Sequence, residues 1–294
     1  MQKNRLKLLI IALLAIVLYA CDTSKNTNNN ASSETESSEI IDDSYQPGEA
    51  WKLVWSDEFN GKKVNTSNWN HQIVKAGRFN EEWQRYTDSE ENAYIEDGSL
   101  VIEAIHESDE HGLNQYTSAR MNTANKQYWK YGKIAARMKL PYGQGIWPAF
   151  WMLGNNINEN GGDTPWPQCG EIDILELYGT RDDAVVEANL HYANKEDSHS
   201  MMGAVPYKLE AGIFADSFHV FALEWDSEKV TWLVDENQYA ATPINTEEFK
   251  EFHEEFFILF NIAVGGTYAG YPDSTTVFPQ KMYVDWVRVY EQKE

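Results

Sequence analysis

Cysteine is almost absent from the chain, which carries 2 cysteines, Cys21 and Cys169, among its 294 residues. Two thiols allow at most one disulfide, so the multi-disulfide frameworks of small secreted domains are excluded. Cys169 directly precedes a stretch of alternating acidic and apolar residues, and no pattern of histidines pairs with it. We therefore expect Cys169 to be a small packing residue rather than a nucleophile.

Positive charge is scarce as well. The chain has 24 lysines and arginines against 46 acids, which gives a formal net charge of −22. Such a surface repels nucleic acid and other anionic polymers within a Debye length, so we expect no nucleic-acid partner. The charge fits a neutral substrate better than a sulfated one, although a solubility or salt-adaptation trait explains it equally well.

Long apolar runs are missing except near the start, where Leu8 to Tyr19 follows a short basic segment. The run has the length of a signal-peptide core and is too short for a comfortable membrane span. Residues 1–20 are therefore predicted to be a signal peptide. Residues 21–50 are rich in Asn, Ser, Thr and acids, with almost no large apolar side chain. Such a segment buries too little surface to offset its ordering entropy, and we expect a flexible tether.

The end of the apolar run, Leu18-Tyr-Ala-Cys21, resembles a bacterial lipoprotein box. The resemblance implies cleavage before Cys21 and lipidation of its sulfur. The protein would then be a membrane-anchored lipoprotein outside the cytoplasm, at the cell surface or in the periplasm. An ordinary secretory signal with an incidental cysteine is the alternative. With Cys21 lipidated, Cys169 has no partner for an intramolecular disulfide.

Strand patterns fill residues 51–294, which contain all 11 tryptophans. A hairpin is predicted over residues 93–103 with Asp97-Gly98 at its turn. Only residues 246–255 look helical. Many short strands separated by turn signals predict one all-β domain, a two-sheet antiparallel β-sandwich. The further strands are expected at residues 133–140, 146–153, 185–192, 218–225, 229–234, 256–264 and 281–290.

Three carboxylates, Glu171, Asp173 and Glu176, lie within six residues of one predicted strand. Strict alternation puts Glu171 and Asp173 on one face but turns Glu176 into the core, where an unpaired carboxylate is too costly. One extra residue, a β-bulge near Ile174-Leu175, brings Glu176 onto the acidic face. A helix would spread the three acids over a wide arc, and the two β-branched isoleucines favour a strand.

The spacing of the acids suits the hydrolysis of a glycosidic bond. Positions four apart on a strand are separated by ~13 Å. Two glutamates leaning toward each other leave roughly 5 Å between their carboxyl groups, which is the separation of a retaining rather than an inverting glycosidase. Asp173 lies between them and can share a proton with the nucleophile. Two other interpretations are the solvated face of a half-exposed strand and a metal site, but the nearby indoles of Trp147, Trp151 and Trp166 favour a sugar-binding site.

The acidic stretch resembles the E-x-D-x-x-E signature of glycoside hydrolase family 16 in its bulged, laminarinase-like form. Further segments resemble bacterial endo-β-1,3-glucanases in the order of that family, and the similarity runs from about Trp51 to Tyr290. These segments are Trp55-Ser-Asp-Glu-Phe-Asn-Gly61, Asn80-Glu-Glu-Trp-Gln-Arg-Tyr-Thr87, Tyr116-Thr-Ser-Ala-Arg120, Gly145-Ile-Trp-Pro-Ala-Phe-Trp-Met-Leu-Gly154, Asn261-Ile-Ala-Val-Gly-Gly266 and Val284-Asp-Trp-Val-Arg-Val-Tyr290.

The resemblance implies a curved β-jelly roll with a substrate cleft across its concave sheet. It also implies endo-hydrolysis of β-1,3-glucan with Glu171 as nucleophile, Asp173 as its assistant and Glu176 as acid/base, without a catalytic cofactor. Close rivals are a mixed-linkage β-1,3-1,4-glucan or an agar-type galactan as substrate. A rival of another class is a catalytically silent glycan-binding lipoprotein, which has no need of all three acids. We expect a monomer.

Several further residues are expected to bind the glucan. Sugar rings stack their C–H faces on indoles, which makes Trp147, Trp151 and Trp166 candidate platforms, although any one tryptophan can equally be a packing residue. We assign Trp225, Trp232 and Trp286 to the core. By resemblance, the positions lining the glucan subsites are Asn80, Trp83, Arg120 and His191. For Arg120 the alternative is a surface ion pair, and for His191 it is a structural histidine.

A structural calcium site on the convex face, far from the acids, is also implied by the resemblance. The matching positions are Glu58, the backbone carbonyl of Gly98, and Asp285. Oxygen ligands from separate segments suit Ca²⁺, and the sequence contains no EF-hand loop. Such an ion would tie the two ends of the domain together.

Overall fold

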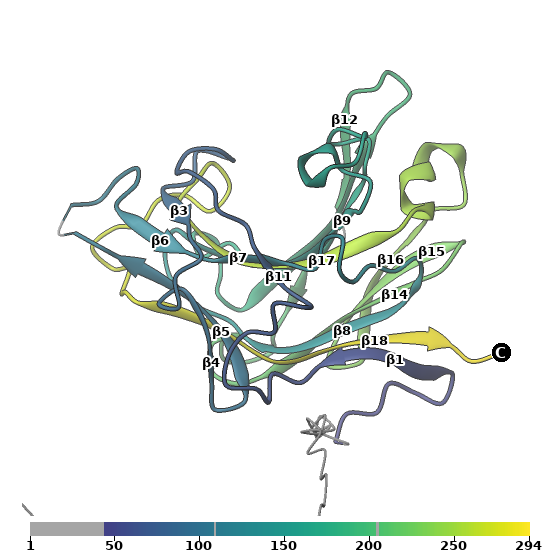
Figure 1. Cartoon of the computed structure of the whole chain (residues 1–294), viewed down its shortest axis with the longest axis horizontal. Coiled ribbons are helices and arrows are strands. Elements are labelled where there is room, and N and C mark those ends of the chain that lie inside the picture. Colours follow the sequence, from purple (N-terminus) through teal and green to yellow (C-terminus); the bar gives the residue numbers. More distant parts are fainter. Residues whose placement is uncertain (1–43, 109, 204–205) are drawn as a thin grey trace, which may run out of the picture. The chain divides into compact units, whose positions relative to one another are not determined.

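The computed structural model describes residues 44–108, 110–203 and 206–294 (Figure 1). The predicted signal peptide, Cys21 and most of the predicted tether lie outside these residues. Among the described residues, no helix is long and apolar enough to cross a membrane.

The described chain folds into two β-sheets, as predicted. The ten-stranded sheet has the order β16 (Asn237–Pro243), β15 (Lys229–Val234), β14 (His219–Trp225), β8 (Gly132–Lys139), β18 (Gln280–Gln292), β5 (Ser99–His106), β6 (Tyr116–Ser118) and β3 (Gln84–Tyr86), with β1 (Trp51–Asp57) beside β18 and β4 (Ala93–Glu96) beside β5. The eight-stranded sheet has the order β12 (His199–Gly203), β11 (Val185–Ala193), β10 (Glu171–Glu176), β9 (Ile146–Gly154), β17 (Phe256–Val264), β7 (Arg120–Asn122) and β2 (Asn70–His71), with β13 (Tyr207–Lys208) beside β11. Neighbouring strands run antiparallel except β3 and β6, which are parallel.

The predicted local elements are confirmed. The first hairpin is β4–β5, and its turn uses the positive φ of Asp97 (49°) and Gly98 (76°) that a tight hairpin favours. The predicted helix at residues 246–255 is a 3₁₀ segment, η2 (Glu247–His253), which is irregular at Phe249. A second short 3₁₀ turn is η1 (Asn158–Asn160).

The main core lies between the sheets. Ile172, Ile174 and Leu175 of β10 all enter it, so the acidic strand is anchored from behind by apolar side chains. Trp225 and Trp232 are buried in the same core, as predicted. The indole N–H of Trp232 donates to the backbone oxygen of Asp173 at 2.9 Å. The ten-stranded sheet therefore holds the middle of β10 by packing and by a hydrogen bond.

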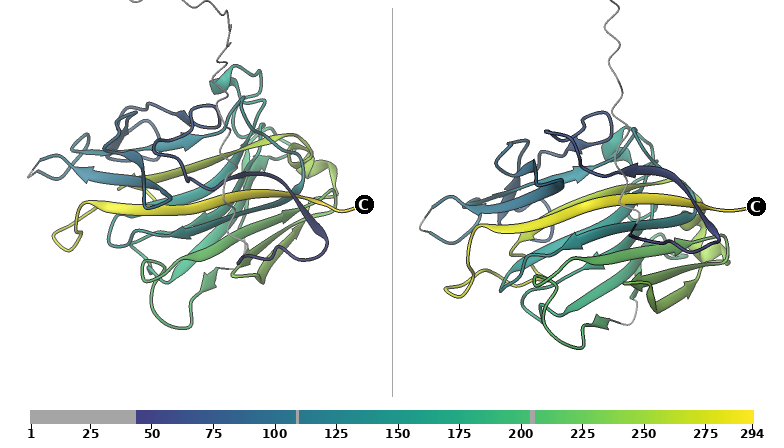
Figure 2. Two further views of the ribbon diagram at one scale, coloured as in Figure 1. Left: turned by 60° about the horizontal axis from the view of Figure 1, so that its bottom comes forward. Right: turned by 90° about the horizontal axis from the view of Figure 1, so that it is seen from below.

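The long strand β18 ties the ends of the domain to its centre. It pairs with β1, β5 and β8, and Figure 2 shows it in yellow as the strand that extends across this sheet to the C-terminus. Trp286 of β18 is buried as predicted, in a second cluster that Tyr45 joins at 4.9 Å between ring centroids. The buried Lys133 donates to the backbone oxygen of Pro47 at 3.2 Å. The last residues of the predicted tether, from Tyr45 onward, thus pack on the domain.

Candidate active site

The predicted bulge is present in β10, the acidic strand. Residues 171–173 pair with residues 153–151 of β9, and residues 175–176 pair with residues 150–149. Ile174 is therefore the extra residue. The register with β11 shifts over the same stretch, between Asp173 and Glu176. The bulge resets the alternation of the strand and returns Glu176 to the face that carries Glu171 and Asp173.

The three carboxylates lie on the face of the eight-stranded sheet that points away from the core. Figure 1 shows that this sheet curves with its concave side away from the ten-stranded sheet. Asp173 is 3% exposed and Glu176 is 8% exposed, while the side chain of Glu171 is 18% exposed. A solvated strand face exposes its charges, so that interpretation of the pattern is wrong. Burying acids without cationic partners is costly, and their retention here points to chemistry.

Three donors surround the carboxylate of Glu176. Trp147 Nε1 donates to Oε1 at 2.9 Å, and Tyr178 Oη and Asn189 Nδ2 donate to Oε2 at 2.8 and 2.9 Å. Burial raises the pKa of Glu176, and the three hydrogen bonds oppose that rise by stabilising the ionised form. A carboxyl held between these influences can give up a proton and take one back.

Glu171 and Asp173 share the imidazole of His191. Its Nε2 lies 3.2 Å from Asp173 Oδ2 and 3.7 Å from Glu171 Oε1. The indole N–H of Trp166 donates to the other oxygen of Glu171, Oε2, at 3.1 Å. Burial, followed by the charge of Asp173, raises the pKa of Glu171 to about 8, and burial and Glu176 raise the pKa of Asp173. The cluster therefore retains protons that ordinary carboxyls lose.

The tryptophans predicted as sugar platforms differ in their environment. Trp166 is 44% exposed and presents an open indole beside Glu171. Trp147 and Trp151 are buried, and each acts as an N–H donor: Trp147 to Glu176, as above, and Trp151 to Asn261 Oδ1 at 2.8 Å. Contact of all three with a sugar ring remains a prediction.

The guanidinium of Arg120 lies between two rings, 4.9 Å from the centroid of Phe79 and 4.5 Å from that of Trp151. Its Nε donates to Gln72 Oε1 at 2.7 Å. Arg120 is buried, and its guanidinium contacts an amide oxygen and two rings, so the surface ion pair considered for it is wrong.

A hydrogen-bonded chain leads from Trp151 away from the acidic strand. Asn261 Nδ2 donates to Tyr86 Oη at 3.1 Å, Tyr86 Oη donates to the buried Glu82 at 3.3 Å, and Asn80 Nδ2 donates to Glu82 at 3.2 Å. The predicted site residue Asn80 is thus connected to the concave face. Trp83, in the same segment of the chain as Asn80, stacks on Tyr271 with ring centroids 4.4 Å apart.

Sequence reasoning missed Tyr178, Asn189, His199, Glu82 and Asn261. Tyr178 stands two positions after Glu176, which is a readable signal because such residues share a face of a strand. The other four contacts depend on the register between strands or on loop conformation, and no local pattern announces them.

The side chains predicted for calcium are engaged by arginines. Arg288 donates to both oxygens of the buried Glu58, at 2.8 and 2.7 Å. Arg137 Nη1 donates to Asp285 Oδ2 at 2.6 Å. The carboxylate of Glu58 is therefore unsuited to hold an ion, which leaves backbone carbonyl oxygens and the second oxygen of Asp285.

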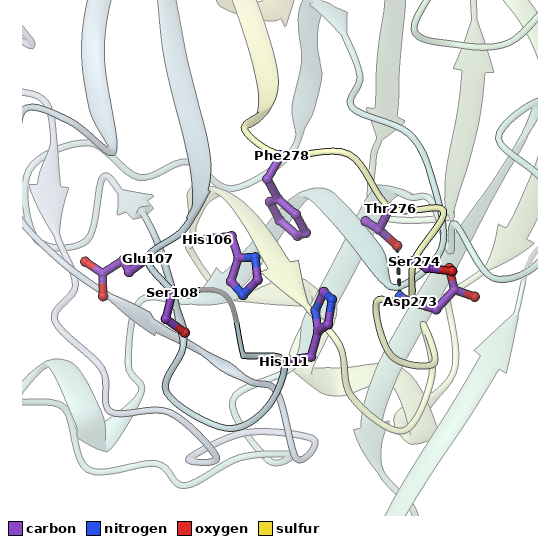
Figure 3. Close-up of a pocket in the computed structure, with 8 residues that line it drawn as sticks. All are labelled: His106, Glu107, Ser108, His111, Asp273, Ser274, Thr276 and Phe278. Carbon is purple, nitrogen blue, oxygen red and sulfur yellow. Dashed lines mark hydrogen bonds between the residues drawn. The ribbon is translucent and has the colours of Figure 1, made fainter.

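A surface pocket of about 440 Å³ lies apart from the acids, between the segment after β5 and the segment before β18 (Figure 3). None of the residues predicted to act on or bind the substrate lines it. The lining residues are His106, Glu107, Ser108, His111, Asp273, Ser274, Thr276 and Phe278.

The described geometry agrees with a comparison of the chain to known families. The family model for glycosyl hydrolases family 16 matches residues 79–288, which include the whole acidic strand. The chain belongs to glycosyl hydrolase family 16. The bulged strand with three acids on one face is therefore the family's signature in structural form, and the hydrolase class follows from the family.

Several proteins similar to the chain carry the names of glucan-degrading enzymes. The chain is 37% identical to a β-glucanase of Rhodothermus marinus over 83% of this chain and 86% of the relative. It is also 37% identical to the clotting factor G alpha subunit of Tachypleus tridentatus, covering 82% of this chain but 34% of that longer protein. The laminarinase catalytic domain of Thermotoga maritima matches with a TM-score of 0.73 and 45% identity, covering 84% of this chain and all (100%) of that domain.

Proposed function

We propose that the protein is a retaining endo-glycosidase that hydrolyses β-1,3-glucan as a monomer. Glu171 is the nucleophile, Asp173 its assistant and Glu176 the acid/base. The observation that carries the proposal is the bulge at Ile174, which returns Glu176 to the face of the concave sheet that carries Glu171 and Asp173. The family membership supports the reaction class, and the laminarinase and β-glucanase relatives support the substrate class.

The reaction takes two displacements. Glu171 attacks the anomeric carbon while Glu176 gives its proton to the departing glycosidic oxygen. Water then attacks the anomeric carbon and gives a proton to Glu176, while the bond to Glu171 breaks and Glu171 leaves as a carboxylate. Asp173, whose pKa is raised, keeps a proton beside Glu171 and limits the repulsion between the acids.

Different side chains orient the carboxyl groups of Glu171 and Glu176. Trp166 fixes Oε2 of Glu171 by its indole N–H, so Oε1 is the oxygen that remains for attack. Trp147, Tyr178 and Asn189 fix the carboxyl of Glu176 and stabilise its ionised form after proton transfer. Neither role requires a metal or an organic cofactor.

Reducing-sugar release from laminarin, lichenan and agarose tests the substrate assignment. We expect the highest kcat/KM on laminarin, because the chain is 45% identical to the laminarinase catalytic domain of Thermotoga maritima. Faster release from lichenan or agarose would assign the enzyme to one of the rival substrates. Binding of laminarin without release from any polymer would favour a silent glycan-binding protein.

Replacing Tyr178 by Phe should move the basic limb of the kcat/KM profile to higher pH. The phenol stabilises the ionised form of Glu176, so its loss raises the pKa of the acid/base and preserves the required proton to higher pH. A hydrogen bond to a charged group contributes about 1.5–3 kcal/mol, which corresponds to roughly 1–2 pH units.

The matched control is Tyr239→Phe, because the buried hydroxyl of Tyr239 has no hydrogen-bond partner in the described structure. Its basic limb should coincide with that of the wild type. A limb that moves to lower pH in Tyr178→Phe would contradict the role given to Glu176.

We also propose a structural Ca²⁺ bound through backbone carbonyl oxygens near Glu58 and Gly98 together with Asp285. Oxygen donors from separate segments suit this ion, and Asp285 has one oxygen outside its pair with Arg137. Free calcium at 100 times Kd stabilises by ~2.7 kcal/mol, which raises Tm by roughly 5–10 °C. Thermal melts in millimolar calcium and in EDTA measure the difference. Asp285→Asn should reduce the difference in Tm between the two buffers, and Asp163→Asn should leave that difference unchanged. An equal Tm of the wild type in both buffers would contradict the site.

The membrane anchor at Cys21 remains a proposal, supported by the Leu-Tyr-Ala-Cys sequence that ends an apolar run. As a flexible coil, the predicted tether of about 29 residues would span roughly 30 Å, enough to lift the domain clear of the lipid headgroups. Metabolic fatty-acid labelling with membrane fractionation tests it. We expect label in the membrane fraction for the wild type and none for Cys21→Ser. Unlabelled, soluble wild-type protein would exclude the anchor and leave the hydrolase assignment intact.

A further inference from the structure

His191 and the two acids it approaches have the donor set of a transition-metal site. One oxygen each of Glu171 and Asp173 and a ring nitrogen of His191 lie within 4.8 Å of one another. Zinc binds carboxylate oxygen and imidazole nitrogen at about 2.0–2.2 Å, which puts neighbouring ligand atoms of a tetrahedral site ~3.4 Å apart. The separations of these oxygens from His191 Nε2, 3.2 and 3.7 Å, lie on either side of that value.

An independent observation also points to a ligand here. Asp173 is 3% exposed, and its Oδ2, the oxygen that faces His191, has no hydrogen-bond partner in the described structure. The 3.2 Å approach of His191 Nε2 is a close contact without hydrogen-bond alignment. A buried carboxylate oxygen without a donor is costly, and a cation bound at that point would offset the cost.

His199 contacts the ring nitrogen of His191 that does not approach the acids. Its Nε2 lies 2.9 Å from His191 Nδ1, and the two rings are stacked at 5.1 Å with an interplanar angle of 17°. When Nδ1–H of His191 donates to His199, Nε2 of His191 is left with its lone pair toward the acids. Hydrogen bonding at the far nitrogen of a metal-binding histidine is the usual way its orientation and tautomer are set.

We propose that Zn²⁺ binds to Glu171, Asp173 and His191, with His199 orienting His191, and that bound zinc inhibits the enzyme. The ion takes the oxygen of Glu171 that is otherwise available for attack. Trp166 holds the other oxygen and leaves an open side, since its indole is exposed. Imidazole among the ligands favours zinc over calcium or magnesium, which prefer oxygen alone. Zinc and glucan therefore exclude one another.

Zinc binding to the full chain can be measured by competition with a chromophoric chelator, a readout that needs no activity. We expect His191→Gln to weaken zinc binding at least tenfold and His199→Phe to weaken it about tenfold. The matched control is His111→Gln, because His106 and His111 form another stacked histidine pair, with ring centroids 4.9 Å apart. It should bind zinc as the wild type does.

Inhibition kinetics supply the second measurement, and this part rests on the proposed function. Zinc should be competitive against laminarin, with an inhibition constant that matches the chelator-derived Kd. Wild-type zinc affinity in His191→Gln, or a loss in His111→Gln instead, would overturn the site. Should His191→Gln fail to fold, unchanged affinity in His199→Phe, whose side chain lies at the exposed edge strand β12, would overturn it as well.

Discussion

Glu171→Gln is expected to lose hydrolysis of laminarin by about four orders of magnitude or more in kcat. An amide cannot form the glycosyl-enzyme bond, and the neighbouring carboxyls of Asp173 and Glu176 have other roles in the proposed reaction. The amide is nearly isosteric with the carboxyl group that it replaces, and it brings no charge into a site where burial and Asp173 raise the pKa of Glu171. Initial rates of reducing-sugar release, measured with stopped samples over hours, cover the required range.

The fold should survive this substitution, which thermal melting of Glu171→Gln tests separately from activity. Glu103→Gln is the matched control, because Glu103 lies on β5 of the other sheet and pairs with Lys281 near the surface. Its kcat should stay within about twofold of the wild type, since surface substitutions rarely change more. A Glu171→Gln enzyme with more than about a tenth of wild-type kcat would show that another group is the nucleophile.

Glu176→Ala is expected to separate the two chemical steps. On laminarin, loss of the general acid should lower kcat by about 10²–10⁴-fold. An activated aryl β-glycoside of laminaribiose has a phenolate leaving group that departs without a proton. The first step on this substrate should therefore be far less affected. The second step then lacks a general base, and the glycosyl-enzyme should accumulate as a burst of released phenol.

Added azide gives this variant a nucleophile that needs no base. We expect azide to restore turnover of the aryl substrate and to form the β-glycosyl azide, because the second displacement inverts the α-linked intermediate. Glu176→Gln is the more conservative partner, since an amide oxygen in the place of Oε2 still accepts from Tyr178 and Asn189. Its NH2 group then faces the indole N–H of Trp147, and that hydrogen bond is lost. An α-glycosyl azide, or equal losses on both substrates, would contradict the acid/base role of Glu176.

The position of the acids was predictable because a single physical constraint decides it. A carboxylate at Glu176 cannot lie in the core without a partner, so the strand had to gain a residue, and Ile174 is that residue. The core roles of Trp225 and Trp232 followed from apolar strands that alternate with turns. Local periodicity therefore predicts the two-sheet fold and the strand on which the acids lie.

The surroundings of the acids were not predictable to the same degree. Asn189 reaches Glu176, and His199 reaches His191, only because β11 pairs with β10 and β12 pairs with β11 in one particular register. The burial of Trp147 and Trp151 depends on strands that pack beside them. Glu58 pairs with Arg288, which is distant in the sequence, and Asp285 pairs with Arg137 of the neighbouring strand β8. Such contacts follow from the assembled sheets, and no short stretch of sequence contains them.

The anomeric form of the first product tests the central claim most directly. Proton NMR of a fresh laminarin digest, recorded before mutarotation, distinguishes the α from the β anomeric proton of the new reducing end. Double displacement by Glu171 and Glu176 predicts that the β-anomer appears first and the α-anomer grows in later. An α-anomer at the first time point would mean a single displacement by water, and would contradict the assignment of Glu171 as a covalent nucleophile.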